Sequence, residues 1–182
     1  MPTTWPRSSR RSWTTPAPEG YWRAMELRDP RSGDYGWMVE RHGALYFEEY
    51  GWGLPFEAIV ARIVADFATA HSERERCWIA DLDGKRAGCV LVVENEDDPT
   101  AAQLRVLLVE PWARGHGIGD ALVRAVVEFS RAAGYRRVVL WTNKQLHAAR
   151  RIYERFGFEL VEEMPDESYH PGQIAQVWAL TL

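Results

Sequence analysis

"RGHGIG", residues 114–119, carries glycine at three alternate positions, between the aliphatic run LRVLLVEP and the helix-like segment DALVRAVVEFSRAAGY. Glycine lacks a Cβ atom, so successive glycines let the chain turn tightly and let a ligand reach the main-chain N–H groups. At the start of a helix these N–H groups have no intrahelical acceptor, and the helix dipole adds partial positive charge. The stretch therefore predicts a strand, a turn that binds a phosphate or pyrophosphate, and a helix.

The glycine spacing excludes two common nucleotide-binding patterns. The dinucleotide pattern G-x-G-x-x-G needs glycine at position 120 or 122, where the chain has Asp120 and Leu122. The nucleoside-triphosphate loop needs Lys followed by Ser or Thr after its last glycine, and the chain has neither there. The pattern that fits is Arg-x-x-Gly-x-Gly, formed by Arg114, Gly117 and Gly119.

Length and composition predict one globular domain. The chain has 182 residues, of which 46% are hydrophobic and 26% charged. Residues 1–20 hold four prolines and no apolar period, so we expect a flexible tail, with residues 21–182 as the domain. A net charge of -4 argues against nucleic acid as a partner. No apolar run suits a membrane span or a secretory signal, so we expect a cytoplasmic protein without a membrane partner.

Hydrophobic periodicity and turn residues predict the order of strands and helices. Asp83-Gly84 suits a tight hairpin turn between two strands. Cys77 and Cys89 lack metal-ligand spacing, so we expect buried free thiols, no disulfide and no metal site. The expected strands cover residues 21–29, 77–82, 86–94, 103–109, 137–142, 158–164 and 173–182, and the expected helices cover 32–52, 55–71, 118 to about 134, and 147 to about 156. This order predicts an α/β sheet that is parallel locally and antiparallel elsewhere.

A second motif, RRIYERFGFEL at residues 150–160, completes a recognisable pair with the glycine turn. Together the two motifs resemble the GNAT superfamily of acyl-coenzyme A dependent N-acetyltransferases, with a likeness that runs from about residue 25 to 182. The stretches HGALYFEEYGW and LWTNKQLHAARRIYERFGF further resemble the acetyltransferase half of proteins that fuse a MarR-like DNA-binding domain to such a domain.

The resemblance implies a mixed, mostly antiparallel sheet with about four helices, in which the parallel fourth and fifth strands splay apart. It also implies transfer of an acetyl group from acetyl-CoA to a primary amine of a small molecule, amino acid or protein. The pantetheine arm would lie along Leu107, Leu108 and Val109. The pyrophosphate would lie on the amides of the glycine turn, formed by Arg114, Gly115, His116, Gly117, Ile118, Gly119 and Asp120. Since the Asp120 carboxylate would repel a phosphate, its side chain should point away from the ligand.

The resemblance also implies catalytic residues. Tyr153 matches the family tyrosine that acts as the acid, although on composition alone it is equally a core aromatic. Leu146 stands where many relatives have an asparagine that contacts coenzyme A, and Asn143 is the candidate to replace that contact. The base is open between Glu49, Glu110 and a chain of waters. We favour Glu49, because neighbouring aromatic residues would raise its pKa by desolvation.

An alternative function is a catalytically weak acyl-CoA-binding sensor or interaction module. The absence of a carboxylate within residues 103–109 and the presence of Leu146 favour it. Under either function we expect a homodimer to be possible through the terminal strands, because an exposed strand edge invites pairing.

Overall fold

The described residues, 24–182 in a computed structural model of the chain, form one seven-stranded sheet in the order β1-β2-β3-β4-β5-β7-β6. The predicted tail at residues 1–20 lies outside the described residues. The strands are β1 (Met25–Arg28), β2 (Arg76–Leu82), β3 (Lys85–Glu94), β4 (Ala101–Val109), β5 (Arg137–Asn143), β6 (Glu159–Asp166) and β7 (Gln173–Thr181). The helices are α1 (Asp34–Tyr50), α2 (Leu54–Ala70), α3 (Ile118–Ala132) and α4 (His147–Arg155), with a short 3-10 turn at Pro111–Ala113. The predicted α/β fold and its order of elements are confirmed.

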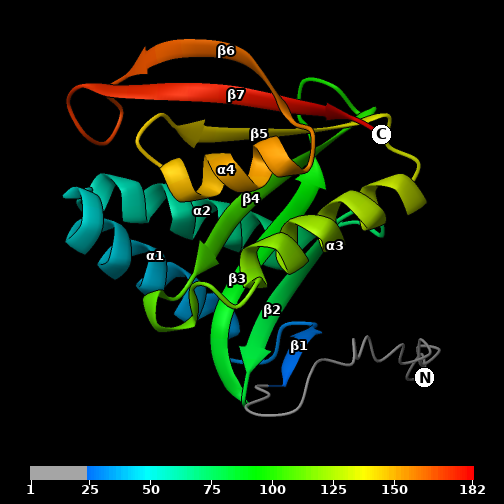
Figure 1. Ribbon diagram of the computed structural model, residues 1–182, viewed down its shortest axis with the longest axis horizontal. Helices are drawn as coiled ribbons and strands as arrows, with labels where there is room; N and C mark the ends of the chain where they lie inside the picture. The colour runs from blue at the N-terminus through cyan, green and yellow to red at the C-terminus, as the bar shows by residue number, and fades with distance from the viewer. Residues whose placement is uncertain (1–23) are drawn as a thin grey trace.

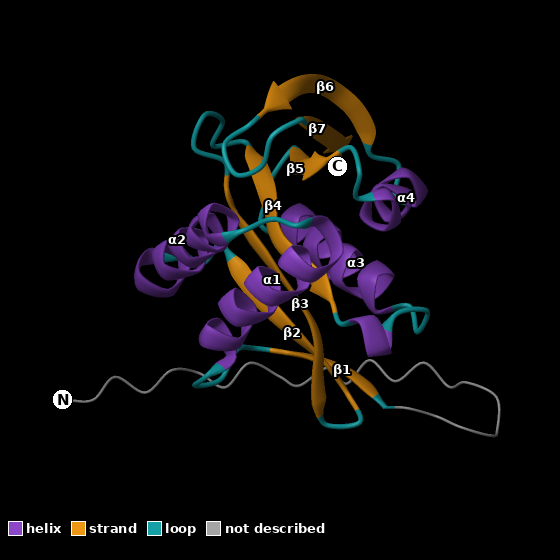
Figure 2. Ribbon diagram, turned by 90° about the vertical axis from the view of Figure 1, so that its left-hand side faces the viewer, coloured by secondary structure: helices purple, strands orange, loops and turns teal. Residues whose placement is uncertain are grey.

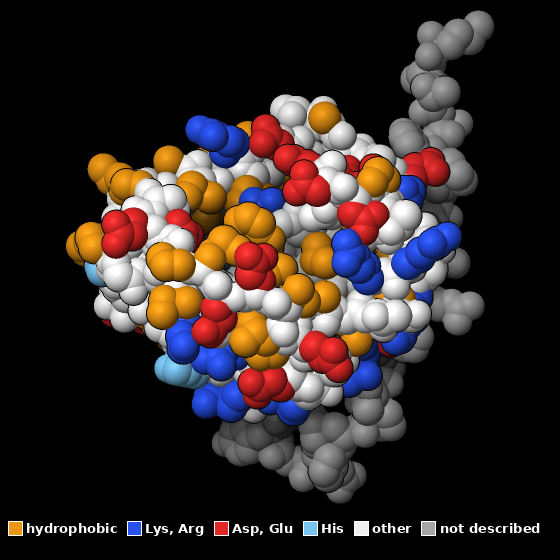
Figure 3. Space-filling model, turned by 90° about the horizontal axis from the view of Figure 1, so that it is seen from above, with side chains coloured by type: hydrophobic (Ala, Val, Ile, Leu, Met, Phe, Trp, Pro, Cys, Tyr) orange, Lys and Arg blue, Asp and Glu red, His pale blue; other side chains and the backbone are white. Residues whose placement is uncertain are grey.

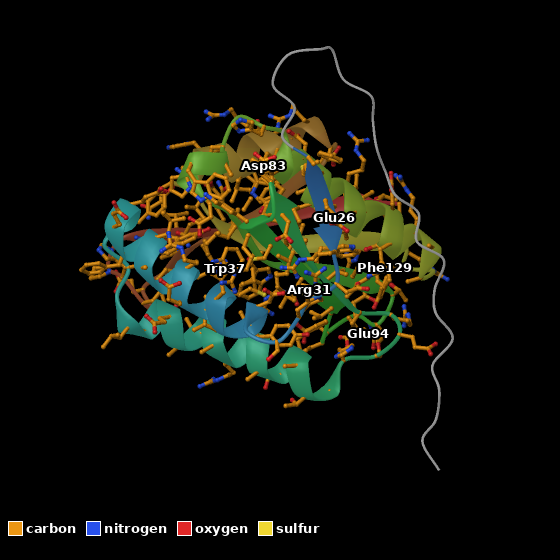
Figure 4. All side chains as sticks on the ribbon, turned by 90° about the horizontal axis from the view of Figure 1, so that it is seen from below. Glu26, Arg31, Trp37, Asp83, Glu94 and Phe129 are labelled. Atoms are coloured by element: carbon orange, nitrogen blue, oxygen red, sulfur yellow. The ribbon has the colours of Figure 1, made fainter. Side chains whose placement is uncertain are left out.

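The helices cover both faces of the sheet. Figures 1 and 2 show α1 and α2 on one side and α3 and α4 on the other. From below, Trp37 of α1 and Phe129 of α3 lie on opposite sides of the strands (Figure 4). Each pair of helices closes its own hydrophobic core, which we call the α1/α2 core and the α3/α4 core. No helix between residues 24 and 182 is long and apolar enough to cross a membrane.

The turn between β2 and β3 is a tight hairpin, as predicted. Asp83 has a φ of 53° and Gly84 a φ of 74°, so both central residues are left-handed. Two left-handed residues match the right-handed twist of the flanking strands, and Asp-Gly is among the few pairs that adopt them readily.

The parallel strands β4 and β5 pair only over their first halves. Their register runs from Ala101 opposite Arg137 to Leu104 opposite Leu140 and then stops. Beyond that point the two strands diverge (Figure 1). On its other edge β4 slips one residue against β3, and Val106 has a φ of 56°. A left-handed β-branched residue is strained by about 1–2 kcal/mol, and such a bulge bends the strand that carries it.

The free edges of the described sheet belong to β1 and β6. The last strand, β7, lies between β5 and β6. Of the two terminal strands of the described region, only β1 is therefore at an edge, which corrects the expectation that both could pair with a second copy. Pro165 lies in β6, where an edge strand tolerates the missing N–H donor.

Candidate functional site

The glycine turn presents main-chain donors that have no acceptor. Gly115 has a φ of 81° and Gly117 a φ of 75°, and a Cβ atom at either position would meet nothing within 4 Å. Within the described part of the chain, the amides of residues 115–120 make no hydrogen bond. The first amide to reach a carbonyl is that of Ala121, 3.0 Å from the oxygen of Gly117. These open, unpaired N–H groups at the start of α3 have the form that an anion site requires.

Gly119 has a different role from the other two glycines of the turn. A Cβ atom there would lie 2.5 Å from Cδ1 of Ile152, on α4. The missing side chain therefore lets α4 pack closely against the first turn of α3. All three glycines were expected to give a ligand access to the main chain, and the role of Gly119 in the contact between the two helices was not predicted.

The side chains of Asp120, Arg114 and His116 in the glycine turn all contact other protein groups. Arg155 of α4 binds the Asp120 carboxylate at 2.6 Å. Arg114, expected on phosphate, instead lies 2.7 Å from the carboxylate of Glu49. The His116 ring is within 3.0 Å of the Arg114 carbonyl. These contacts leave the main-chain donors as the groups available to a ligand.

The edge of β4 that faces β5 has no strand partner past Leu104. Along this stretch Leu107 and Val109 pack against the α3/α4 core, whereas Leu108 is buried in the α1/α2 core. The three residues predicted to line the pantetheine arm thus lie along the gap between the strands, and the chain leads from them through Pro111–Ala113 into the glycine turn.

Tyr153, predicted as the catalytic acid or a core aromatic, is buried in the α3/α4 core. It is 3% exposed, and its ring lies 5.7 Å from that of Phe158. Its hydroxyl makes no hydrogen bond within residues 24–182, and burial raises its pKa well above the ordinary value. Burial also raises the pKa of Tyr46 on α1, and Tyr153 adds to that effect through space. Tyr153 lies in the α3/α4 core and Tyr46 packs against the α1/α2 core, so the two phenols belong to opposite faces of the sheet.

Both carboxylates considered as the base are ion paired. Glu49 binds Arg114 and does not have the apolar enclosure that we expected. The aromatic rings near it pack on one another instead, with Tyr46 5.2 Å from Trp52. Glu110 is buried and accepts two hydrogen bonds from Arg41, at 2.6 and 3.0 Å. Glu110 is thus held by a bidentate contact typical of a structural ion pair.

Asn143 ends β5 beside a cluster of aromatic rings formed by Trp52, Phe56 and Tyr169. Its Nδ2 donates to the hydroxyl of Tyr169, from the loop between β6 and β7, while its buried Oδ1 has no partner. The Tyr169 ring lies 4.9 Å from Trp52 and 5.3 Å from Phe56. Trp52 Nε1 and Gln173 Oε1 are likewise buried without a partner among the described residues. Because Tyr169 is far from Trp52 and Phe56 in the sequence, no local pattern could have predicted that its ring packs on theirs.

Comparisons with known proteins match the chain to one family and one fold. The chain is 42% identical over 89 residues to N-acetylaspartate synthetase of Danio rerio, covering 49% of this chain and 31% of that protein. It spans less than half the length of the first curated relatives that it matches.

Solved structures share the fold, and two of them hold acetyl-CoA or CoA. The yncA protein of Salmonella typhimurium, determined with its cofactor acetyl-CoA, has a TM-score of 0.69 at 17% identity, over 87% of this chain and 94% of that one. Spermidine N-acetyltransferase of Vibrio cholerae, in complex with CoA and spermine, has a TM-score of 0.67 at 17% identity, over 86% and 95% of the two chains. The model of the acetyltransferase (GNAT) family matches residues 39–158, which is more than half of the chain. The protein therefore belongs to the acetyltransferase (GNAT) family.

Proposed function

We propose that this protein transfers an acetyl group from acetyl-CoA to a primary amine of a small molecule, an amino acid or a protein. The observation that carries the proposal is the row of unpaired amides at residues 115–120, at the mouth of a gap between two parallel strands. Acetyl-CoA supplies an acetyl thioester together with a pyrophosphate. The residues fit that molecule, because Gly115 and Gly117 leave open space in front of the donors.

The chain's own residues would bind the two ends of this molecule differently. The edge formed by Leu107, Leu108 and Val109 offers main-chain groups to the amides of the pantetheine arm. The turn from Arg114 to Asp120 offers N–H donors to the pyrophosphate, and hydrogen bonds to an anion are stronger than those between neutral groups. Asn143, at the end of β5, remains the candidate from the sequence for a further contact with CoA.

Two groups would move protons during transfer. Tyr153 is the proposed donor of a proton to the departing sulfur, because a phenol carries its proton at neutral pH. Glu49 is the proposed acceptor of the proton from the ammonium. Support for it comes from its position beside the aromatic cluster, since its carboxylate contributes to the raised pKa of Tyr50.

The relatives support amine acetylation and differ in acceptor. One is an N-acetylaspartate synthetase and another a spermidine N-acetyltransferase, so similarity alone leaves the acceptor of this chain open. The likeness to the acetyltransferase half of MarR fusion proteins, the cytoplasmic location, the possible dimer and the absence of nucleic-acid and membrane partners stay predictions from the sequence.

A catalytically weak acyl-CoA sensor is the second candidate function. Its support is that Glu49 and Glu110 are both engaged by arginines, which leaves neither carboxylate unpaired.

Two measurements on the full chain separate these functions. Isothermal titration calorimetry measures CoA binding, and a thiol-release assay with acetyl-CoA measures transfer to a panel of amino acids, polyamines and peptide N-termini. Binding together with amine-dependent thiol release supports the transferase. Binding without release for any amine supports the sensor, and a chain that does not bind CoA refutes both.

A further inference from the structure

Arg105 is the first residue of β4 beyond its pairing with β5, which ends at Leu104. Leu104 and Leu107 both pack into the α3/α4 core, so the bulge turns the two residues between them toward the opposite face. Val106 accordingly packs into the α1/α2 core. The Arg105 side chain therefore leaves the sheet on the α2 side, at the point where the gap between the strands opens.

The Arg105 guanidinium has no hydrogen bond and no ion pair within residues 24–182, although it is partly buried. Burial lowers its pKa, and the carboxylates of Glu96 and Asp66 oppose that effect only through space. Arg28 and Arg41, which are also partly buried, each bind carboxylates at 2.6 Å. An arginine keeps its charge in proteins, and a partly buried charge without a partner is unfavourable. An anion bound at Arg105 would remove that cost.

An unpaired acceptor, Asn143 Oδ1, belongs to a residue on the same face of the sheet as Arg105. Leu140 of β5 packs into the α3/α4 core. Because side chains alternate along a strand, Trp141 and Asn143 both lie on the opposite face, which is the face of Arg105. Asn143 Oδ1 is buried and unpaired, and can accept an N–H of an amine. Trp141 is 62% exposed between them along β5. Seen from above, the end of the sheet formed by β5, β7 and β6 shows gathered hydrophobic side chains (Figure 3).

We propose, resting on the proposed transferase function, that Arg105 binds the carboxylate of the acceptor and that the acceptor class is the amino acids. A free α-amino acid carries both groups that this face lacks, a carboxylate for the guanidinium and an amine for Asn143 Oδ1. Arginine matches a carboxylate with two parallel hydrogen bonds, which fixes the orientation of the amine relative to the gap. A polyamine lacks a carboxylate and would leave the guanidinium without a partner.

The test compares amino acids with the amines that remain after the carboxylate is removed. The probes are leucine and isopentylamine, phenylalanine and phenethylamine, and lysine and cadaverine. Calorimetry measures the binding of each to the protein alone and to the CoA-loaded protein. We expect at least one amino acid to bind 10-fold or more tightly than its decarboxylated partner. We expect Arg105→Gln to weaken the binding of that amino acid by roughly 10- to 100-fold and to leave the affinity for its decarboxylated amine unchanged.

Two further variants keep the result interpretable. Arg105→Lys retains the charge without the bidentate geometry, so it should retain part of the preference. Arg137→Gln is the control, because Arg137 lies at the far end of the same strand pair, where it binds Asp98 at 2.7 Å. Thermal unfolding and CoA affinity, unchanged in Arg105→Gln, would exclude misfolding as the cause of the loss.

The inference is overturned if no amino acid binds, if amines bind as tightly as their parent amino acids, or if Arg105→Gln keeps the preference. It is also overturned if the control loses the preference to the same degree. Failure of the transferase proposal has a different signature. In that case the preference that depends on Arg105 persists in the binding measurement, while no amine causes thiol release.

Discussion

Replacing Gly117 by alanine tests whether the open amides of the glycine turn bind CoA. Gly134, which follows α3, provides a matched control. Gly117 has a φ of 75° and Gly134 a φ of 80°, and a Cβ atom at either meets nothing within 4 Å. Both alanine variants therefore carry the same backbone strain, about 1–2 kcal/mol. We expect the two melting temperatures to fall by similar amounts.

The two variants should differ in ligand binding. A methyl group at residue 117 stands in front of the amides of residues 115–120, in space that a pyrophosphate needs. If the anion loses two charge-assisted hydrogen bonds of about 1.5 kcal/mol each, the loss is about 3 kcal/mol. The dissociation constant for CoA then rises roughly 100-fold in Gly117→Ala, since 1.4 kcal/mol corresponds to a factor of ten. Gly134→Ala should keep the affinity of the unmodified chain.

Calorimetry with CoA measures the affinities, and thermal unfolding measures the shared strain. The reasoning is refuted if Gly117→Ala binds CoA within a few-fold of Gly134→Ala while both are folded. An equal loss of affinity in both variants would also refute it, because the effect would then come from strain and not from the open donors.

Three further predictions follow from buried groups. Tyr153→Phe should lower kcat by about 100-fold and leave the affinity for acetyl-CoA unchanged, because the phenol donates a proton and does not bind; unchanged kcat in steady-state assays would remove it from the mechanism. Burial lowers the pKa of His42 from 6.5 to about 4, so the unfolded chain binds a proton in this range and the folded chain does not. Stability should therefore fall by about 3 kcal/mol as the pH falls from 6.5 to 4, and urea titrations should show a flatter profile for His42→Gln but not for the surface control His71→Gln. Glu110→Gln breaks the buried ion pair with Arg41 and should reduce the free energy of unfolding by about 2 kcal/mol. The loss is moderate because Arg41 keeps partial contact with water, and kcat should change little. A large loss of kcat at unchanged stability would instead identify Glu110 as the base.

Features set by neighbouring residues could be predicted from the sequence. The hairpin at Asp83 and Gly84 depends on two residues that tolerate a positive φ, and both adopt it. Gly115 and Gly117 are predictable for the same reason. The amphipathic helix α2 follows from its apolar period, and Pro55 near its start fits a position whose N–H has no helical acceptor.

Features set by contacts between distant segments could not be predicted. Glu49 and Arg114 are 65 positions apart, so their ion pair leaves no local signal. The closeness of Gly119 to Ile152 depends on how α4 crosses α3. Arg105 reads in the sequence as one charge within an apolar strand. Only the packing of its neighbour Leu104 in the α3/α4 core shows which face it occupies.

The strained bulge at Val106 lies where the pairing of β4 with β5 has ended. The pairing of β4 with β3 does not require this bulge, whereas the proposed site depends on the open edge beyond it. β4 resumes its pairing with β3 after the bulge, with Leu108 opposite Cys89, so a regular strand could have kept the same partner without a left-handed valine. A regular β4 could also have continued its pairing with β5 past Leu140. That pairing would cover the edge at Leu107–Val109 and close the gap between the two strands. It would also move Val106 to the face opposite Arg105. The strain of about 1–2 kcal/mol at one residue thus opens the edge proposed for the pantetheine arm, directly beyond the arginine proposed to bind the acceptor.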